Sequence, residues 1–249
     1  MKIIIPARYQ STRLPGKPVK NIDGVPMIVR VLKQAAKVAA ADQVIVACDD
    51  ERIFDAVEQA GGTAVMTCQD HQSGTDRIAD ALSGLSLPDD EIILNVQGDE
   101  PFIPVDLIQM TADALRNNQD AHISTCVTPI VDKGDIINPN VVKAVMDDQG
   151  RALYFSRAPI PFDRDGLGTG HYFRHIGIYG YRYHALKTMT TAPVHPLEAL
   201  EKLEQLRALG LGMTIQVGVY QDPVPHGVDT EADLQAAIEY AQAHRQDYL

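Results

Sequence analysis

Three cations, Arg8, Arg13 and Lys17, lie within ten residues near the start of the chain. They follow a short apolar run and precede the first helical pattern, so they belong to one long loop. Arginine binds phosphate oxygens through paired hydrogen bonds, and lysine adds a compact point charge. The spacing therefore suits a triphosphate, although a solvated basic loop has the same composition.

This loop lacks the common glycine-rich phosphate motifs. Lys17 is followed by Pro18, and the first glycine of a Walker A motif is missing. No G-x-G-x-x-G follows the apolar run either. A loop longer than about 12 residues inside a compact domain is usually functional or disordered. Its length therefore favours a binding role.

A carboxylate stands at a comparable place further along the chain. Asp99 follows an apolar run over residues 92–96, so we expect it beyond the carboxyl end of a strand. Mg²⁺ takes one or two carboxylates together with substrate phosphates and water. Asp99 is thus a candidate metal ligand, and an internal ion pair with the basic loop is the alternative.

Small polar residues precede a helical pattern over residues 74–82. Gln72, Ser73 and Gly74 would leave free backbone N–H groups at the helix start, where a ligand can bind. Simple helix capping by Ser73 explains the same residues. The sequence leaves both interpretations open.

Elements of α/β type are expected to position these groups. Apolar runs over residues 2–5, 43–47, 64–67 and 92–96 alternate with helical patterns over residues 26–37, 51–60 and 74–82. Such alternation is typical of βαβ units and predicts a doubly wound, mostly parallel sheet. Ligands bind beyond the carboxyl ends of such strands, where the basic loop and Asp99 fall.

The second half of the chain has a different pattern. Longer β-type stretches cover residues 122–130, 141–146, 152–156 and 172–181, with a hairpin turn expected at residues 147–150. A helix over residues 196–209, a strand over 214–220 and a helix from about Glu231 then follow. We predict one domain over residues 1–249 that carries an inserted β-rich lobe over about 122–182.

Composition excludes several classes of protein. The 249 residues carry 22 Lys and Arg against 33 Asp and Glu, a net charge of −11. This disfavours binding to nucleic acid, which needs a basic face. Residues 1–30 nevertheless hold six basic residues and one acidic residue, so we expect a small anionic ligand.

Cysteine usage and hydropathy indicate the compartment. Cys48, Cys68 and Cys126 show no C-x-x-C spacing, which argues against a disulfide framework or a structural zinc site. Cys68 and Cys126 are expected to be buried thiols. No secretory h-region or membrane span of about 20 apolar residues is recognisable. We expect a cytoplasmic protein without membrane insertion.

Seven segments together resemble one family. The first, IPARYQSTRLPGKP at residues 5–18, is similar to the nucleotide-binding signature of 3-deoxy-manno-octulosonate (Kdo) cytidylyltransferases. The other six follow in the family's order and span nearly the whole chain: HQSGTDR (71–77), VQGDEP (96–101), YFSR (154–157), RHIGIYG (174–180), LEQLR (203–207) and GVDT (227–230).

The resemblance implies an activity and a fold. The family transfers CMP from CTP to the anomeric hydroxyl of Kdo, releases pyrophosphate and forms CMP-Kdo for lipopolysaccharide biosynthesis. The implied fold is that of nucleotide-diphospho-sugar transferases. A homodimer through the β-rich lobe is also implied, as is Mg²⁺ bound by Asp99 and Asp229. Asp229 precedes the last predicted helix, and Thr230 is the better candidate for its N-cap.

Residue roles carry over from the same motifs. Catalysis is implied for Arg8, Arg13, Lys17 and Asp99. The resemblance implies nucleotide contacts for these residues: Ala7, Arg8, Lys17, Gln72, Ser73, Gly74 and Arg77. Sugar contacts are implied for Gln97, Arg157, His175, Tyr179, Glu204 and Gln205.

Three of the sugar candidates have structural alternatives. Arg157 suits a surface ion pair, His175 a satisfied strand histidine, and Glu204 a pair with Arg207 at i+3. Gly166, Gly168 and Gly170 mark a loop that we expect to be flexible and to close over the sugar.

Two other functions compete with CMP transfer to Kdo: one uses a different sugar as substrate, and the other is not catalytic. A cytidylyltransferase for another acidic sugar, an 8-amino octulosonate or a sialic acid, would use similar motifs. Acylneuraminate cytidylyltransferases share the opening IPAR but resemble a G-S-K-x-type continuation, which this chain lacks. A non-catalytic nucleotide-binding protein could share the fold. Asp99, Asp229 and the cations together argue against it.

Overall fold

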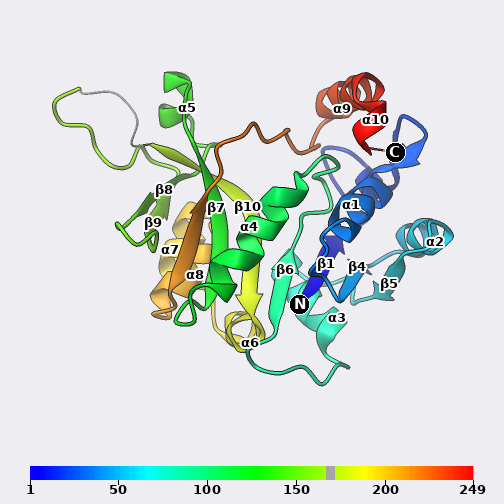
Figure 1. Cartoon of the computed structure of the whole chain (residues 1–249), viewed down its shortest axis with the longest axis horizontal. Coiled ribbons are helices and arrows are strands. Elements are labelled where there is room, and N and C mark those ends of the chain that lie inside the picture. The colour runs from blue at the N-terminus through cyan, green and yellow to red at the C-terminus, as the bar shows by residue number, and fades with distance from the viewer. Residues whose placement is uncertain (167–171, 249) are drawn as a thin grey trace. The chain divides into compact units, whose positions relative to one another are not determined.

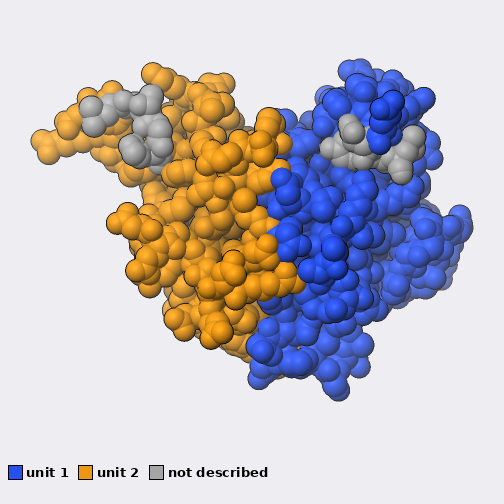
Figure 2. All heavy atoms as spheres, in the orientation of Figure 1, with its two compact units in different colours: residues 1–109, 224–249 blue, residues 110–223 orange. Residues whose placement is uncertain are grey.

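The computed structural model describes residues 1–166 and 172–248. These residues form two compact units, coloured separately in Figure 2. Unit 1 comprises Met1–Gln109 and Val224–Leu249, and unit 2 comprises Met110–Pro223. The predicted lobe over residues 122–182 falls within unit 2, while the single-domain assignment stays a prediction.

Unit 1 contains a parallel sheet in the order β6-β1-β4-β5 (Figure 1). Its strands match the sequence expectation within one residue or two: β1 (Lys2–Ala7), β4 (Gln43–Cys48), β5 (Thr63–Met66) and β6 (Ile92–Asn95). The chain builds outward from β1 through β4 to β5, and β6 then pairs with the opposite side of β1. The strand order therefore reverses at β1, which confirms the α/β class.

Helices of unit 1 follow the predicted periodicity. They are α1 (Met27–Ala36), α2 (Glu51–Gln59) and α3 (Gly74–Leu82). In α1 the apolar residues that recur on one face are buried, including Met27, Val31 and Ala35. Asp50 caps α2 and Ser73 caps α3, each through a side-chain oxygen that accepts a backbone N–H.

The C-terminal segment of the chain packs against the N-terminal segment of unit 1. The 3₁₀ helix η1 (Lys17–Val19) and the short strands β2 (Asn21–Ile22) and β3 (Val25–Pro26) follow the basic loop. Leu14 and Met27 are buried in a cluster with Val228 and with Leu234 of α9 (Glu231–Ala243). This packing holds the segment before α9 beside the basic loop. A final short helix, α10, spans Arg245–Tyr248.

Unit 2 is the β-rich part of the chain. Strand β7 (Ile123–Pro129) pairs in parallel with β11 (Ile215–Val219) and antiparallel with β10 (Phe173–Arg182). Strand β8 (Lys143–Met146) then pairs antiparallel with β10 and with β9 (Ala152–Ser156). The predicted hairpin turn is present, because Gly150 N donates to Asp147 O. The helices of this unit are α5 (Lys133–Ile137), α6 (Tyr183–Thr191), α7 (Pro196–Glu201) and α8 (Gln205–Gly210).

The helical prediction for residues 196–209 is wrong in one respect. The segment forms two helices, α7 and α8, because Lys202 takes a left-handed conformation with φ of 55°. The Glu201 carboxylate at this break accepts hydrogen bonds from Ser156 Oγ and Arg157 N. Contacts with β9 therefore override the continuous helical pattern.

The structure differs from the sequence prediction in one further helix and in the burial of one cysteine. Helix α4 (Val105–Arg116) follows β6 and was not predicted, and the boundary between the units falls inside it. Cys68 is exposed rather than buried. Gly168 and Gly170 of the expected flexible loop lie outside the described residues. None of the helices in the described ranges has the length and apolarity that a membrane crossing requires.

Gly98 tests how closely the loop after β6 must approach β1. A Cβ atom there would lie 2.8 Å from the carbonyl oxygen of Pro6, so backbone would have to move. We expect Gly98→Ala to lower the free energy of unfolding by about 1–3 kcal/mol, as other overpacked sites do. Urea titration followed by circular dichroism measures this. Gly84→Ala is the matched control, since its Cβ would meet nothing within 4 Å. Equal stability of the two variants would contradict the close approach.

Candidate active site

A cavity of about 440 Å³ lies in unit 1 where the strand order reverses. It is lined by residues at and just after the end of β1, such as Ala7 and Arg8, and by residues that follow β6, such as Gln97 and Asp99. In open α/β sheets, ligands bind outside the carboxyl ends of the strands at such a reversal. The cavity therefore occupies the position that the fold favours for a ligand.

The basic loop forms one wall of this cavity. Ala7, Arg8, Arg13 and Lys17 all line it. The loop is anchored by the buried side chain of Leu14, whose N–H donates to Ser11 Oγ at 3.2 Å. Arg8 and Arg13 remain exposed. Exposed guanidinium groups on an anchored backbone can bind an anion with little rearrangement of the chain.

The ammonium of Lys17 links the two candidate metal ligands, Asp99 and Asp229. Its Nζ donates to Asp99 Oδ2 at 2.6 Å and to Asp229 Oδ1 at 3.0 Å. Arg13 Nη2 lies 3.1 Å from the same oxygen of Asp229. The structure thus brings together four predicted residues from three distant segments, and the ion pair expected as the alternative for Asp99 is present.

These charges alter the acid–base state of Lys17. Burial alone would lower the pKa of its ammonium, but the neighbouring Asp99 and Asp229 outweigh burial and raise the pKa above its ordinary value. Lys17 is therefore fully charged at neutral pH. It can neutralise negative charge in the cavity without supplying a proton.

Backbone contacts place Asp229 beside Asp99. Val228 N donates to Asp99 O at 2.9 Å, and the Val228 side chain is buried in the cluster with Leu14. Thr230 is the N-cap of α9, in a capping box with Asp233. Asp229 is therefore not needed as the cap, and its carboxylate faces the cavity lining.

The two carboxylates supply part of the coordination that a hard divalent cation needs. Asp99 and Asp229 both contact one ammonium, so their oxygens converge on a single point. Within the described ranges, no group of three or more His, Cys, Asp or Glu side chains is arranged to hold a metal ion. A pair of carboxylates completed by phosphates and water is the arrangement typical of Mg²⁺.

The start of α3 forms the opposite wall. Gln72, Ser73, Gly74 and Arg77 line the cavity, and their contact with a nucleotide stays a prediction. The capping interpretation of Ser73 is confirmed, because its Oγ accepts Asp76 N at 3.1 Å. A Cβ atom at Gly74 would lie 3.3 Å from Pro6 Cγ, so α3 begins directly against the end of β1.

The remaining sugar candidates lie in unit 2, whereas Gln97 lines the cavity of unit 1. Tyr179, Glu204 and Gln205 line one small cavity of about 20 Å³, the size of a single water molecule. Gln205 is 5% exposed, and its Nε2 is buried without a hydrogen-bond partner among the described residues. An open donor beside a tyrosine and a carboxylate suits a hydroxylated ligand.

His175 is held beside this group. Its Nε2 lies 2.8 Å from Thr125 Oγ1, and its ring centroid lies 5.3 Å from that of Tyr179. Burial lowers the pKa of His175 to about 4. The imidazole is thus neutral at pH 7 and acts as a hydrogen-bonding group. The satisfied-histidine interpretation is supported.

The side chain of Arg157 binds carbonyl groups. Its Nε donates to Glu201 O at 2.7 Å and its Nη1 to Pro139 O at 2.8 Å, so these bonds differ from the surface ion pair that was the alternative. Arg207 binds the carboxylate of Glu198 at 2.6 and 2.8 Å, across the break at Lys202. The i+3 pair of Glu204 with Arg207 stays a prediction.

Sequence reasoning missed two acids behind the cavity. Asp49 contacts Arg77, and Asp80 lies 2.7 Å from Nε2 of His71, which lines the cavity. Asp49 follows β4 directly, so the strand-end argument applied to Asp99 would have found it. Burial raises the pKa of the Cys48 thiol to about 11, which leaves this neighbour protonated and unreactive.

Comparisons with known proteins agree with this geometry. A family model described as cytidylyltransferase matches residues 2–215. The 3-deoxy-manno-octulosonate cytidylyltransferase of Proteus mirabilis (strain HI4320) is 50% identical over 252 residues, covering 99% of each chain. The protein of the same name from Hahella chejuensis (strain KCTC 2396) is 51% identical over 241 residues, covering 94% of each chain.

Solved structures give the same result. A structure of CMP:2-keto-3-deoxy-manno-octonic acid synthetase complexed with CTP is 38% identical and covers 97% of this chain and 98% of its own, with a TM-score of 0.92. A 4-diphosphocytidyl-2C-methyl-D-erythritol synthase from Anaerococcus prevotii DSM 20548 is 18% identical, with coverage of 97% of both chains and a TM-score of 0.63, and shows the fold alone.

Fold and cavity therefore define a nucleotidyltransferase of the α/β kind. The chain belongs to the cytidylyltransferase family, within it to the 3-deoxy-manno-octulosonate cytidylyltransferases.

Acid titration tests the neutral state of His175. The folded protein has a pKa of about 4 at this group against 6.5 for the ordinary value, so the unfolded chain binds the proton more readily. The contribution of neutral His175 to the free energy of unfolding is complete above pH 6.5. It falls as the pH drops towards 4, by about 1.4 kcal/mol per pH unit and about 3 kcal/mol in all. We expect His175→Gln to flatten this part of the profile.

Urea unfolding at a series of pH values measures the effect. His122, whose pKa is also lowered, first by burial and then by His184 and Arg182, supplies a second test: His122→Gln should change the profile in the same direction. An identical pH dependence in wild type and His175→Gln would show that His175 does not titrate in this range.

Proposed function

We propose that the protein transfers CMP from CTP to the anomeric hydroxyl of 3-deoxy-D-manno-octulosonate, releasing pyrophosphate and forming CMP-Kdo for lipopolysaccharide biosynthesis. The observation that carries this proposal is the contact of Lys17 with both Asp99 and Asp229 in the cavity beyond β1 and β6. The names of relatives about half identical over nearly the full length support the choice of substrates.

The cations of the first loop bind the triphosphate. Arg8, Arg13 and Lys17 line one cavity and carry the charge that three phosphates require. The sugar hydroxyl oxygen attacks the α-phosphorus in line, and the bond to the bridging oxygen of the β-phosphate breaks. Fixed cations stabilise the charge that grows on the leaving pyrophosphate.

Asp99 and Asp229 hold Mg²⁺ in this proposal. Their converging oxygens support it, and their hard donors match the preference of the ion. When bound, Mg²⁺ polarises the α-phosphate and lowers the pKa of the attacking hydroxyl. The chain's own part is to orient the two carboxylates through Val228 and through the start of α9.

The nucleotide base lies against Ala7 and the start of α3. Gln72, Ser73, Gly74 and Arg77 line this wall, and the small side chains leave room for a planar ring. Cytosine offers an amine donor and carbonyl acceptors at its edges, which backbone groups can match.

Sugar binding is proposed for Gln97 of unit 1 and, as a separate group, for five residues of unit 2. Arg157, His175, Tyr179, Glu204 and Gln205 supply a cation, neutral hydrogen-bonding groups and a carboxylate acceptor. Nε2 of Gln205, which has no hydrogen-bond partner in the part of the chain that the structure describes, supports a role in binding hydroxyl groups. The same chemistry would accept an 8-amino octulosonate or a sialic acid, so the sugar has to be tested directly.

Purified protein with CTP, Mg²⁺ and Kdo should release pyrophosphate, whereas the other three ribonucleoside triphosphates should not support release. Asp99→Asn should abolish nearly all turnover, because one of the two proposed Mg²⁺ ligands is lost. Lys17→Ala should reduce kcat by about 10²–10³. A coupled pyrophosphate assay measures both, with the 8-amino octulosonate and a sialic acid as alternative acceptors.

Asp90→Asn is the matched control, because Asp90 is exposed outside the cavity lining. CTP binding without release from any sugar would favour the non-catalytic nucleotide-binding protein. Normal turnover of Asp99→Asn would remove Asp99 from the mechanism.

A homodimer through unit 2 is the proposed assembly. Leu153 on β9 is 61% exposed and Leu200 on α7 is 80% exposed. The two elements are adjacent, because Glu201 binds Ser156 and Arg157. Exposed apolar side chains gathered on neighbouring elements support contact with a second copy. A cytoplasmic location is likewise proposed, supported by three cysteines that are all free thiols.

Light scattering after size exclusion tests the dimer. We expect wild type at twice the chain mass of 27.2 kDa and Leu200→Glu close to one chain mass, because a buried charge would oppose association. Leu85→Glu, at a comparably apolar exposed position in unit 1, should leave the mass unchanged. A monomeric wild type would contradict the proposed assembly.

A further inference from the structure

We propose that Asp49 is a positioning residue for CTP: its carboxylate ties the start of the basic loop to α3 and so fixes the spacing of the two walls of the nucleotide cavity. This inference rests on the proposed use of that cavity by CTP. Asp49 is not among the residues that line the cavity, so it acts through its neighbours.

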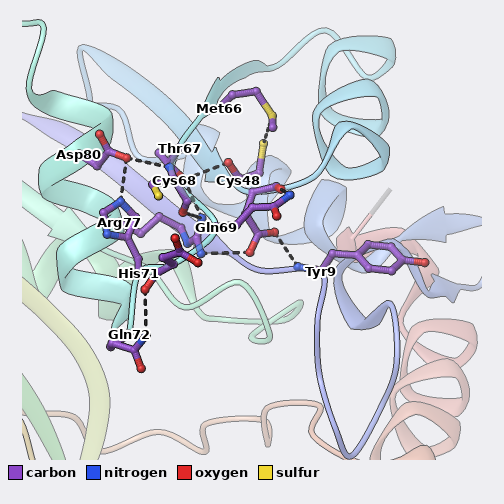
Figure 3. A network of polar contacts seen from close by, with 12 residues as sticks. Tyr9, Cys48, Met66, Thr67, Cys68, Gln69, His71, Gln72, Arg77 and Asp80 are labelled. Carbon is purple, nitrogen blue, oxygen red and sulfur yellow. Dashed lines mark hydrogen bonds and ion pairs between the residues drawn. The ribbon is translucent and has the colours of Figure 1, made fainter.

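The carboxylate of Asp49 makes one contact with each wall. Oδ1 accepts Tyr9 N at 2.8 Å, directly after the lining residue Arg8. Oδ2 accepts Nη2 of Arg77 at 3.0 Å, on the first turns of α3. In Figure 3, dashed lines mark the hydrogen bond donated by Tyr9 N and the hydrogen bonds donated by the guanidinium of Arg77. One side chain thus spans the two segments.

Burial makes this link rigid. Asp49 is 7% exposed and Arg77 is 3% exposed. Arg77 Nη1 donates to Thr67 Oγ1 at 2.6 Å and to Cys68 O at 3.3 Å, so the guanidinium is held on both sides. Charged groups buried in this way cannot exchange partners for water without a large desolvation cost. The distance between Tyr9 and α3 is fixed accordingly.

Tyr9 is held a second time by the segment after β4. The guanidinium carbon of Arg52 lies 3.4 Å from the centroid of the Tyr9 ring, and Arg52 is paired with Asp50. Across the loop, a Cβ atom at Gly16 would lie 3.0 Å from the Tyr9 hydroxyl. Both the backbone and the ring of Tyr9 are therefore located by residues 49–52, and the basic loop begins from a fixed point.

The assignment changes the role of Arg77. The resemblance implies a nucleotide contact for it, and it does line the cavity. Its charge, however, is engaged by Asp49 and its donors by Thr67 and Cys68. Arg77 contributes to CTP binding mainly by holding α3 in place, and its guanidinium is not an additional phosphate ligand.

Asp49→Asn tests the link with almost no change in shape. The amide keeps one acceptor for Tyr9 N but presents an N–H to Arg77, so the tie to α3 is lost. We expect the dissociation constant for CTP, measured by calorimetry without sugar, to rise about 10- to 100-fold, as small misplacements of binding groups do. The KM for Kdo at saturating CTP should stay within about threefold, since Gln97 and unit 2 are untouched.

Thr67→Val is the matched control. It removes another buried partner of Arg77 but leaves the bond to Tyr9. It should lower the melting temperature and leave the CTP dissociation constant within about threefold. Hydrogen exchange adds an independent readout: the Tyr9 amide should exchange faster in Asp49→Asn, because the acceptor it keeps is no longer held in place by Arg77, and it should remain protected in Thr67→Val. A purely structural Asp49 would lower the melting temperature without either change.

A double variant covers the case in which Asp49→Asn does not fold. Asp49→Asn with Arg77→Gln removes both charges, so neither stays buried alone. It should fold and still bind CTP about tenfold more weakly. Wild-type affinity in Asp49→Asn or in the double variant would overturn the positioning role. Absence of CTP binding by the wild type would instead overturn the proposed function itself.

Discussion

The cavity depends on a balance between fixed charges of opposite sign. Lys17 and Arg13 stand against Asp99 and Asp229 within contact distance, and Lys17 is separated from these acids by 82 and 212 residues in sequence. Neither set would be stable alone in a partly enclosed site, since like charges repel and lose hydration together. The fold has to bring both sets to one place, and the reversal of strand order at β1 does this by setting the ends of β1 and β6 side by side.

Packing behind the charges completes the arrangement. The buried cluster of Leu14, Val228 and Leu234 holds the chain before α9 against the basic loop. Apolar contacts of this kind are not directional, so they can bring segments together but cannot set a carboxylate to within a fraction of an ångström. Hydrogen bonds supply that precision: Val228 N to Asp99 O locates Asp229, and Asp49 to Tyr9 N locates the loop that carries Arg8.

Much of unit 1 could be predicted, because the secondary structure that the local sequence favours is also the one that its packing in the folded chain requires. The alternation of apolar runs gave β1 and β4 to within a residue or two, and the small polar residues before α3 gave its N-cap, Ser73. Helix α4 was missed although Leu107, Ile108 and Leu115 are buried at helical spacing, so its signal was present.

The break between α7 and α8 carried no such signal. Lys202 is neither glycine nor proline, and its left-handed conformation depends on contacts between Glu201 and β9 that only the folded chain makes. Arg207 of α8 reaches Glu198 of α7 across that break, a pair that the prediction of one continuous helix did not include. Asp49 is a different case: its position at a strand end was visible, but its partners Tyr9 and Arg77 come from other βα units. No spacing rule links them.

The candidate residues for the two substrates are distributed unequally over the chain. All predicted nucleotide and metal residues belong to unit 1, whereas five of the six predicted sugar residues belong to unit 2, Gln97 being the exception. In the proposed assignment, nucleotide affinity depends on contacts inside one compact unit, which Asp49 and the cluster around Val228 hold in shape. Gln97 and Asp99 lie in the same loop after β6, so a change that moves the candidate metal ligand also moves a candidate sugar-binding group. Coupling between metal and sugar then requires no separate relay, because the short segment after β6 carries a candidate group for each and lines the same cavity as the candidate nucleotide residues.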